Sequence, residues 1–324
     1  MTFFIRLASL FAVVLATILG VAAPASAQQK LKIALLRTTA MIPIIDAEKM
    51  GYFKREGIET EIITLNNGPA ALSAVVSGSA DIGWAATMPV ISAVAEKQPI
   101  RAFLSNNFER WPEPLYTHLI VSERSGIKTL ADLKGKTAAS NATNGGCDLM
   151  IREHIRAAGV PADTVKMAVI PFPQMLAALE LGTVDAVCIV DPFYVSAMQS
   201  PKIKAKELAS GMLADLPKIG AFAADAYFAR EDWLTKNGKA AAGFMRALLA
   251  ADKDLTADPA KYRALLESEF KMPAALASQI PVALNTTSMV ADVKDYKPVI
   301  EGLVRTGLLA KPIDAADVIF AITP

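Results

Sequence analysis

Short apolar runs alternate with segments of helical periodicity from residue 31 to residue 105. The strand candidates are residues 31–36, 59–64, 81–84 and 100–105, and the helix candidates between them are residues 44–51, 69–77 and 88–97. Strands that are separated by helices predict parallel pairing, with crossover helices on both faces of a sheet. The pattern therefore predicts a doubly wound α/β unit.

The same alternation starts again near residue 118. The strand candidates of this second series are residues 118–121, 136–139, 165–169, 184–190 and 204–208, and its clearest helices are residues 147–158 and 173–181. Two successive doubly wound units explain this pattern better than one long sheet. After residue 224 the pattern predicts helices alone, at residues 231–236, 240–252, 259–268 and 273–279. These helices carry too little apolar surface for a third core, so we expect them to pack on the first unit.

The fold class that we expect is therefore α/β, with two doubly wound lobes and a C-terminal helical tail packed on lobe one. Lobe one would comprise residues 28–117 and 221–324, and lobe two residues 118–220. The chain would cross between the lobes near Thr117 and again near Ala221. Two neighbouring crossings form a hinge, because they absorb backbone rotation without disturbing either core.

Residues 1–27 have the pattern of a secretory signal peptide. Arg6 precedes an apolar run from residue 7 to residue 23, and small residues surround Pro24 and lead to Ala27. An uncleaved anchor is the alternative, because the run approaches the roughly 18 residues that can span a bilayer. We favour cleavage after Ala27, since Pro24 breaks the helix and small residues fill the processing positions. The expected location is the periplasm.

Charge and motifs exclude several classes of function. The 33 basic and 32 acidic residues nearly cancel and form no basic cluster with aromatics, so we expect no nucleic acid partner. Neither a glycine-rich nucleotide loop nor a Gly-x-Ser-x-Gly elbow is present in the sequence. His118 and His154 are the only histidines, and they lack the spacing of helical zinc ligands. The sequence therefore predicts no metal, no cofactor and no catalytic residue.

The chain has two cysteines, Cys147 and Cys188. One disulfide bond between them is compatible with an oxidising compartment. Cys188 lies in an apolar strand candidate, whereas Cys147 begins a predicted helix. We favour a buried free thiol at Cys188 over the disulfide bond.

Polar loops follow the predicted strands, where doubly wound sheets bind their ligands. These loops are residues 37–40, 66–68, 85–87, 106–107, 141–146 and 191–193. Their hydroxyl and amide side chains can bind a polar ligand without burying an unpaired charge. The loop from Asn141 to Gly146 is the strongest candidate, because Gly145 and Gly146 let the backbone approach a ligand and the next helix presents free amides. An ordinary helix cap is the alternative.

Four further side chains have two interpretations each. Arg37 would either clamp a carboxylate or sulfonate or lie in solvent. Asp191 would either cap the helix that follows it, which we favour, or accept a hydrogen bond from a ligand amine or hydroxyl. Trp84 and Trp111 are each able to stack on a flat ligand. We expect Trp84 in the core and Trp111 exposed to the cleft.

Four segments, which follow one another in family order, resemble solute-binding proteins of the nitrate/sulfonate/taurine type. They are residues 46–58 (DAEKMGYFKREGI), 77–83 (SGSADIG), 129–136 (TLADLKGK) and 179–186 (LELGTVDA), the last followed by Asp191-Pro192-Phe193. The resemblance covers nearly all of the chain after the signal segment. It implies a type II periplasmic binding protein of an ABC importer, whose lobes close over one solute and whose closed form docks on a permease in the inner membrane.

The resemblance also implies a set of site residues. By analogy the site would draw on Thr38, Thr39, Ala85, Thr87, Asn144, Gly145, Gly146 and Asp191. A sulfonate or carboxylate is the first expectation for the ligand, and a thiamine-pyrimidine precursor or another heterocycle is the second. Val190 stands where many relatives have Trp, which weakens any transfer of their specificity. A monomer is the simplest state for a receptor that must open and dock.

Two other classes of function remain. A relative in the same superfamily makes the thiamine pyrimidine from its own histidine and a lysine-held pyridoxal phosphate. The export signal and the two histidines speak against that enzyme here, so we expect a protein that is not an enzyme. A periplasmic sensor subunit would have the same fold, and a permease encoded beside the gene would favour import instead.

Overall fold

The computed structural model describes residues 28–282 and 290–324. The predicted signal peptide and its cleavage site at Ala27 lie outside the described residues. Within these two ranges, no helix combines the length and the apolar character that crossing a membrane requires.

The first sheet has five strands in the order β2-β1-β3-β12-β4. They are β1 (Gln29–Leu36), β2 (Ile58–Leu65), β3 (Ile82–Ala86), β4 (Ile100–Leu104) and β12 (Asp225–Arg230). β1 pairs in parallel with β2 and β3, as the strand and helix alternation predicts. The helices of this part are α2 (Ile42–Lys49), α3 (Tyr52–Arg55), α4 (Gly68–Val76) and α5 (Thr87–Ala95).

Strand β12 corrects the prediction of helices alone after residue 224. It enters the middle of the first sheet and runs antiparallel to both β3 and β4. The first five of its six residues, up to Ala229, are buried. A strand that is buried on both faces lacks the alternation of a half-exposed strand, so its sequence gave no period-two signal.

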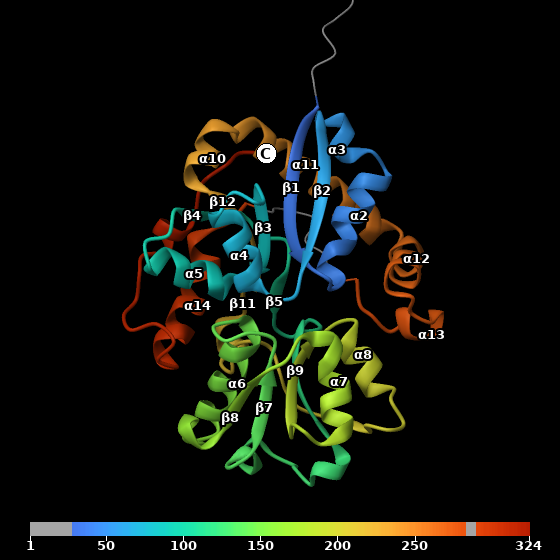
Figure 1. Cartoon of the computed structure of the whole chain (residues 1–324), viewed down its shortest axis with the longest axis vertical. Coiled ribbons are helices and arrows are strands. Elements are labelled where there is room, and N and C mark those ends of the chain that lie inside the picture. Colours follow the sequence, from blue (N-terminus) through green and yellow to red (C-terminus); the bar gives the residue numbers. More distant parts are fainter. Residues whose placement is uncertain (1–27, 283–289) are drawn as a thin grey trace, which may run out of the picture.

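The second sheet lies below the first in Figure 1 and has the order β10-β6-β9-β7-β8. Its strands are β6 (Thr117–Ser122), β7 (Thr137–Ser140), β8 (Lys166–Val169), β9 (Ala186–Val190) and β10 (Ala205–Ser210). β7 is parallel to β8 and β9, whereas β6 is antiparallel to β9 and β10. The expectation of parallel pairing is therefore wrong for β6. The helices of this part are α6 (Gly146–Ala157), α7 (Phe172–Leu181), α8 (Phe193–Met198) and α9 (Leu216–Ile219).

The two segments that connect the sheets are paired with each other. β5 (Phe108–Arg110) and β11 (Ala221–Ala223) form an antiparallel two-stranded ribbon. In Figure 1 this ribbon lies between the upper and lower sheets. Neighbouring crossings of this kind are the arrangement that permits one part to rotate against the other.

The C-terminal helices pack largely on the first sheet and its helices. They are α10 (Glu231–Lys236), α11 (Gly238–Ala257), α12 (Pro259–Phe270), α13 (Ala274–Ala277) and α14 (Val293–Arg305). The ring of Phe244 in α11 lies 5.4 Å from that of Phe53 in α3 and 5.5 Å from that of Tyr227 in β12. The described residues also form five short 3₁₀ helices, at Thr39–Met41, Glu123–Ser125, Leu130–Leu133, Ala162–Thr164 and Ala315–Val318. The mixed α/β fold with a helical tail is confirmed.

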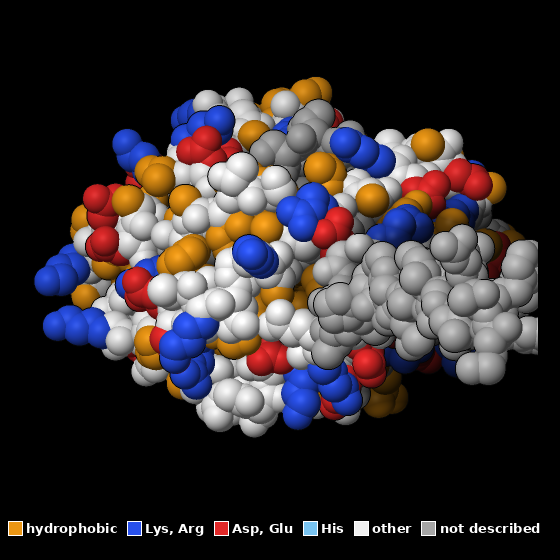
Figure 2. All heavy atoms as spheres, turned by 90° about the horizontal axis from the view of Figure 1, so that it is seen from above, with side chains coloured by type: hydrophobic (Ala, Val, Ile, Leu, Met, Phe, Trp, Pro, Cys, Tyr) orange, Lys and Arg blue, Asp and Glu red, His pale blue; other side chains and the backbone are white. Residues whose placement is uncertain are grey.

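Figure 2 shows the face of the molecule seen from above. Basic and acidic side chains are interspersed over this face, and single hydrophobic side chains lie between them. This mixture agrees with the near-neutral net charge of +1.

Candidate functional site

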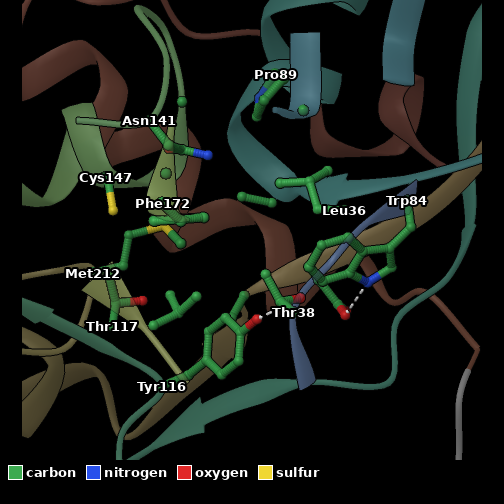
Figure 3. A pocket seen from close by; sticks show the side chains of 17 residues that line it. Leu36, Thr38, Trp84, Pro89, Tyr116, Thr117, Asn141, Cys147, Phe172 and Met212 are labelled. Carbon is green, nitrogen blue, oxygen red and sulfur yellow. Dashed lines mark hydrogen bonds between the residues drawn. The ribbon is translucent and has the colours of Figure 1, made fainter. Parts of the chain in front are cut away.

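A cavity lies between the two sheets, next to the segment that first connects them (Figure 3). Its empty volume, including the part that opens to solvent, is about 530 Å³. The lining residues come from both sheets and from the first connection, and they are Leu36, Thr38, Gly68, Trp84, Ala86, Pro89, Tyr116, Thr117, Asn141, Gly145, Gly146, Cys147, Phe172, Val190, Met212, Ala224 and Asp225.

Four helices begin at this cavity. Gly68 is the first residue of α4, Ala86 is the N-cap of α5, Gly146 is the first residue of α6 and Phe172 is the first residue of α7. The first amide groups of a helix have no partner within that helix and carry a partial positive charge. The cavity is therefore suited to an anionic or hydrogen-bond-accepting group.

The N-terminus of α6 lies close to β3 of the first sheet. A side chain on Gly146 would place its Cβ 3.0 Å from Cβ of Ala86 and 3.1 Å from Cε of Met212. A larger residue would force Ala86 or Met212 to shift by a few tenths of an ångström, and glycine avoids this crowding. Among the described residues none accepts a hydrogen bond from the amides of Gly146 and Cys147.

An acidic residue also belongs to the first turn of α6. Oδ2 of Asp148 accepts a hydrogen bond from the amide of Asn144 at 2.9 Å, and Oδ1 lies 2.7 Å from Nε of Arg152. Asp148 is thereby bonded to its own loop and helix. The amides of Gly146 and Cys147 remain available for a ligand.

A disulfide bond joins Cys147, the second residue of α6, to Cys188 in β9. This corrects the preference for a free thiol at Cys188. The sequence places the two cysteines on separate elements, and only the packing of α6 on the sheet brings their Cα atoms to 5.5 Å. The bond attaches the start of α6 to the strand beneath it.

Further polar groups lie around the cavity. The hydroxyl oxygens of Tyr116 and Thr38 are 3.4 Å apart, and burial raises the pKa of Tyr116 above its ordinary value. Nε1 of Trp84 donates a hydrogen bond to Oδ2 of Asp225 over 2.6 Å. Burial raises the pKa of Asp225 to about 6, even though four donors bond to its carboxylate.

The charge of the lining is unusual for a site that is suited to an anion. Asp225 is the ionisable carboxyl among the lining residues, and these residues include no Lys, Arg or His. An anionic ligand would therefore depend on backbone amides, hydroxyls and the Asn141 amide. Carbon atoms of Leu36, Phe172 and other apolar residues make up the rest of the wall.

A second cavity lies on the other side of Tyr116. Its lining residues are Thr39, Asn107, Phe108, Pro114, Leu115, Tyr116, Asp191, Tyr262, Ile280 and Pro281. Oδ1 of Asp191 accepts a hydrogen bond from the amide of Val195 at 3.3 Å, in the first turn of α8, and burial raises the pKa of this carboxyl. Asp191 thus bonds to the helix that follows it and also faces a cavity.

The structure divides the sequence-predicted site residues into groups. Thr38, Gly145 and Gly146 line the first cavity, whereas Thr39 and Asp191 line the second. Asn144 lines an open groove beside α4 and α5. Ala85 and Thr87 are buried, and the Thr87 hydroxyl donates to the carbonyl of Ala223 at 3.1 Å.

Arg37 and Trp111 line none of these cavities. The guanidinium of Arg37 donates to the carbonyl of Glu269 and lies 5.5 Å from the ring centre of Phe270, so the solvated interpretation fits it better than the clamp. Trp111 is 52% exposed at the end of the first connection. It lies outside the lining of the cavity next to that connection.

Several lining residues had no role in the sequence interpretation. Tyr116, Phe172, Met212 and Asp225 each reach the cavity from a different part of the chain. Asn141 and Gly68 belong to polar loops that the sequence did indicate, and Trp84 was considered for stacking on a ligand but was expected in the core. A local pattern indicates a loop, but it gives no sign of which distant aromatic residue will face that loop.

The sequence pattern of the family described as NMT1/THI5 like matches residues 38–262. Relatives include a putative aliphatic sulfonates-binding protein of Escherichia coli (strain K12), 30% identical over 64% of this chain and 61% of its own length. The nitrate/nitrite binding protein NrtA of Nostoc sp. is 27% identical over 71% of this chain and 55% of its own length. The chain thus matches less than two thirds of the length of these relatives.

An enzyme is also among the relatives. The 4-amino-5-hydroxymethyl-2-methylpyrimidine phosphate synthase of Uromyces fabae is 29% identical over 67% of this chain and 64% of its own length. Among solved structures, the alkanesulfonate-binding protein SsuA from Xanthomonas axonopodis pv. citri, bound to MOPS, superposes with a TM-score of 0.75. That match covers 90% of this chain and 98% of the other at 22% identity, so it shows the shared fold.

Proposed function

The chain belongs to the NMT1/THI5-like family, and from this premise we propose that it is a receptor that closes two lobes over a small organic anion. The lobes that we propose are residues 28–117 with 221–324, and residues 118–220. The binding-protein relatives and the fold shared with SsuA support this proposal.

One observation carries the proposal: the amides at the start of α6, which have no acceptor among the described residues, belong to the lining of a cavity that both sheets line. Helix N-termini attract anions through free amides and the helix dipole. The lining supplies donors from Thr38, Asn141 and Tyr116 and no basic side chain. Such a site suits one anionic group attached to carbon, and a sulfonate or a carboxylate is the class that we propose.

The synthase relative gives a second candidate, but the cavity favours binding. That chemistry would need a histidine and a lysine at the site, and the lining residues include neither. Nδ1 of His118 is 2.8 Å from Oε2 of Glu207, and Nε2 of His154 is 2.7 Å from the carbonyl of Gly211. Both imidazoles thus have partners outside the cavity.

The proposed cellular role is delivery of the solute, in the periplasm, to an ABC permease of the inner membrane, by a monomer whose signal peptide is removed after Ala27. The relatives' names support binding, and delivery is our inference from the family. A receptor for a pyrimidine or another heterocycle, and a sensor not coupled to transport, are the alternatives. Stimulation of the permease's ATPase by the loaded receptor would favour delivery over sensing.

A thermal-shift screen tests the proposal. Residues 28–324 would be unfolded and refolded to remove any carried ligand, then screened with sulfonates, carboxylates, nitrate, pyrimidines and flavins. A ligand at about 100 times its Kd adds about 2.7 kcal/mol to the stability of the folded state. A saturable shift from organic anions supports the proposal, and Arg37→Ala should bind the same anion equally well. A shift from pyrimidines alone would contradict it.

A further inference from the structure

The indole of Trp84 is fixed by a hydrogen bond at the inner end of the cavity. Trp84 lies in β3 and is 4% exposed, and its Nε1 donates to Oδ2 of Asp225 over 2.6 Å. Figure 3 shows this bond, with the six-membered ring of the indole directed toward the middle of the lining residues. The polar edge of Trp84 is therefore occupied by Asp225, and the carbon surface of the six-membered ring is directed toward the other lining residues.

Asp225 is itself anchored to the first connection between the sheets. Its Oδ2 accepts from Nδ2 of Asn107 at 2.5 Å, and its Oδ1 accepts from the amides of Asn106 and Asn107 at 3.2 and 3.1 Å. Rotation of the Trp84 indole would leave a buried carboxylate oxygen with one donor fewer, which is costly. Asp225 therefore holds the indole in one orientation.

Two further aromatic side chains, Tyr116 and Phe172, belong to the same lining. Tyr116 precedes β6 and Phe172 begins α7, so the three aromatic residues come from separate elements. Aromatic pairs with ring centres about 4.5–7 Å apart attract each other beyond the effect of buried area. A flat ring between these side chains would gain that attraction, and a saturated ring of similar size would not.

The lining offers both hydrogen-bond donors and carbon. Backbone amides lie at the start of α6 and hydroxyls at Thr38 and Tyr116, whereas Trp84, Leu36 and Val190 present carbon. A bare inorganic anion would leave part of its surface against carbon without a hydrogen bond, which is unfavourable. The lining thus matches a molecule with an anionic group and an apolar, flat part.

We infer that Trp84 is the specificity-determining residue of this cavity, that it selects anions whose carbon part is a flat unsaturated ring, and that Asp225 is its positioning residue. This inference rests on the proposed function, because it names the ligand class of the same site.

Benzenesulfonate and cyclohexanesulfonate test the inference as a matched pair, because they share a charge and a carbon count. We expect the native chain to bind benzenesulfonate about tenfold more tightly, from the stacking contribution. Trp84→Leu should remove this preference, so that the two sulfonates bind with equal affinity. Trp111→Leu is the control, because Trp111 lies outside the cavity, and it should keep the preference.

The Asp225→Asn variant tests positioning separately. An amide at residue 225 would direct its own NH₂ group at one of the two donor pairs that now bond to the carboxylate, so the new side chain would be held less firmly and would fix the indole less well. We expect the preference for the flat ring to fall at least threefold in Asp225→Asn. Trp84→Phe keeps a ring but has no Nε1 donor, so adding Asp225→Asn to Trp84→Phe should not change the ring preference further. Ligand-induced change in tryptophan fluorescence should disappear in Trp84→Phe and persist in Trp111→Phe.

Each outcome supports or overturns the inference. Equal affinity of the native chain for the two sulfonates overturns it and leaves the anion receptor intact. A preference that survives in Trp84→Leu also overturns it. If neither sulfonate nor any other organic anion binds, the proposed function fails and the inference fails with it. Thermal midpoints of the empty variants show whether each one is folded, and Trp84→Phe keeps the test available if Trp84→Leu is not.

Discussion

Nη2 of Arg305, in the C-terminal helix α14, lies 3.0 Å from Oε2 of Glu153 in α6. Helix α14 packs on β11 and α5, so this ion pair connects the first part of the fold to the helix that begins at the cavity. Glu153 is fully buried, and the same Arg305 nitrogen lies 3.2 Å from Oδ1 of Asp215. One guanidinium therefore serves two carboxylates of the second part.

Arg305→Met should destabilise the protein by about 3 kcal/mol, because it leaves the buried Glu153 carboxylate without its main partner. Urea unfolding measures this loss. Glu153→Gln in the Arg305→Met background should recover part of it, since no buried charge then remains. Lys30→Met, which breaks the exposed pair with Glu61, is the control and should hardly change stability. Equal effects of Arg305→Met and Lys30→Met would contradict this account.

Gly146→Val should weaken anion binding at least about tenfold, because the new side chain would meet Ala86 across the cavity and Met212 on its own side. The empty protein can relieve the contact with Ala86 by opening and the contact with Met212 by a shift of that flexible side chain, so its thermal midpoint should change little. Isothermal titration measures the affinity. Gly238→Val is the matched control, since a Cβ there has no neighbour within 4 Å. Undiminished affinity in Gly146→Val would remove the start of α6 from the site.

Reduction of the disulfide bond should lower stability by about 4 kcal/mol, as chain entropy predicts for cysteines 41 residues apart. Thermal unfolding with and without a phosphine reductant measures the difference. The Cys147→Ala, Cys188→Ala double variant should be less stable than the native chain and should not respond to the reductant. A native chain that is equally stable in both conditions would show that the bond contributes no stability.

Asp252→Asn should stabilise the protein at neutral pH by about 1–3 kcal/mol. Neither carboxyl oxygen of Asp252 has a hydrogen bond of normal geometry among the described residues, and burial raises its pKa well above 3.8 although the neighbouring Asn106 amide lowers it. The folded state therefore binds a proton that the unfolded state has released, and native stability falls as pH rises from near 4 through the raised pKa. Asparagine does not titrate, so the advantage of the variant should grow over that range and be small at pH 4.

Asp254→Asn is the control on the same helix, because the pKa of Asp254 is lowered whereas that of Asp252 is raised. Lys261 and Tyr52 bond to Asp254 and lower its pKa, so its contribution is present at neutral pH and is lost as pH falls through the folded pKa. This variant should be less stable than the native chain at neutral pH, and the difference should shrink in acid. If the stability difference from the native chain changed with pH in the same direction for both variants, the raised pKa of Asp252 and the lowered pKa of Asp254 would both be contradicted.

Much of the fold follows from local sequence patterns. Helix α10 has the predicted bounds, and β9 lies within the predicted run at residues 184–190. Strand β12 escaped prediction because it is buried on both faces and shows no alternation, and its place between β3 and β4 depends on partners more than a hundred residues earlier in the chain. The disulfide bond escaped for the same reason, since only tertiary packing brings α6 to β9.

Some of the residues that the sequence indicated line the cavity and others do not, and this difference has a physical cause. The sequence indicated Gly145 and Gly146, which line the cavity, because a glycine pair before a helix is a local signal. The position of Arg37 depends on Glu269 and Phe270, which arrive from α12 and which no local pattern indicates. The structure shows Trp84 both buried, as expected, and lining the cavity, because its two edges face different surroundings.

A crystal structure of the protein with benzenesulfonate tests the central claim most directly. The account predicts sulfonate oxygens about 2.7–3.2 Å from the amide nitrogens of Gly146 and Cys147, with the ring against the indole of Trp84. A sulfonate bound elsewhere, for example on the far side of Tyr116 beside Asp191, with the amides at the start of α6 facing only water, would contradict it.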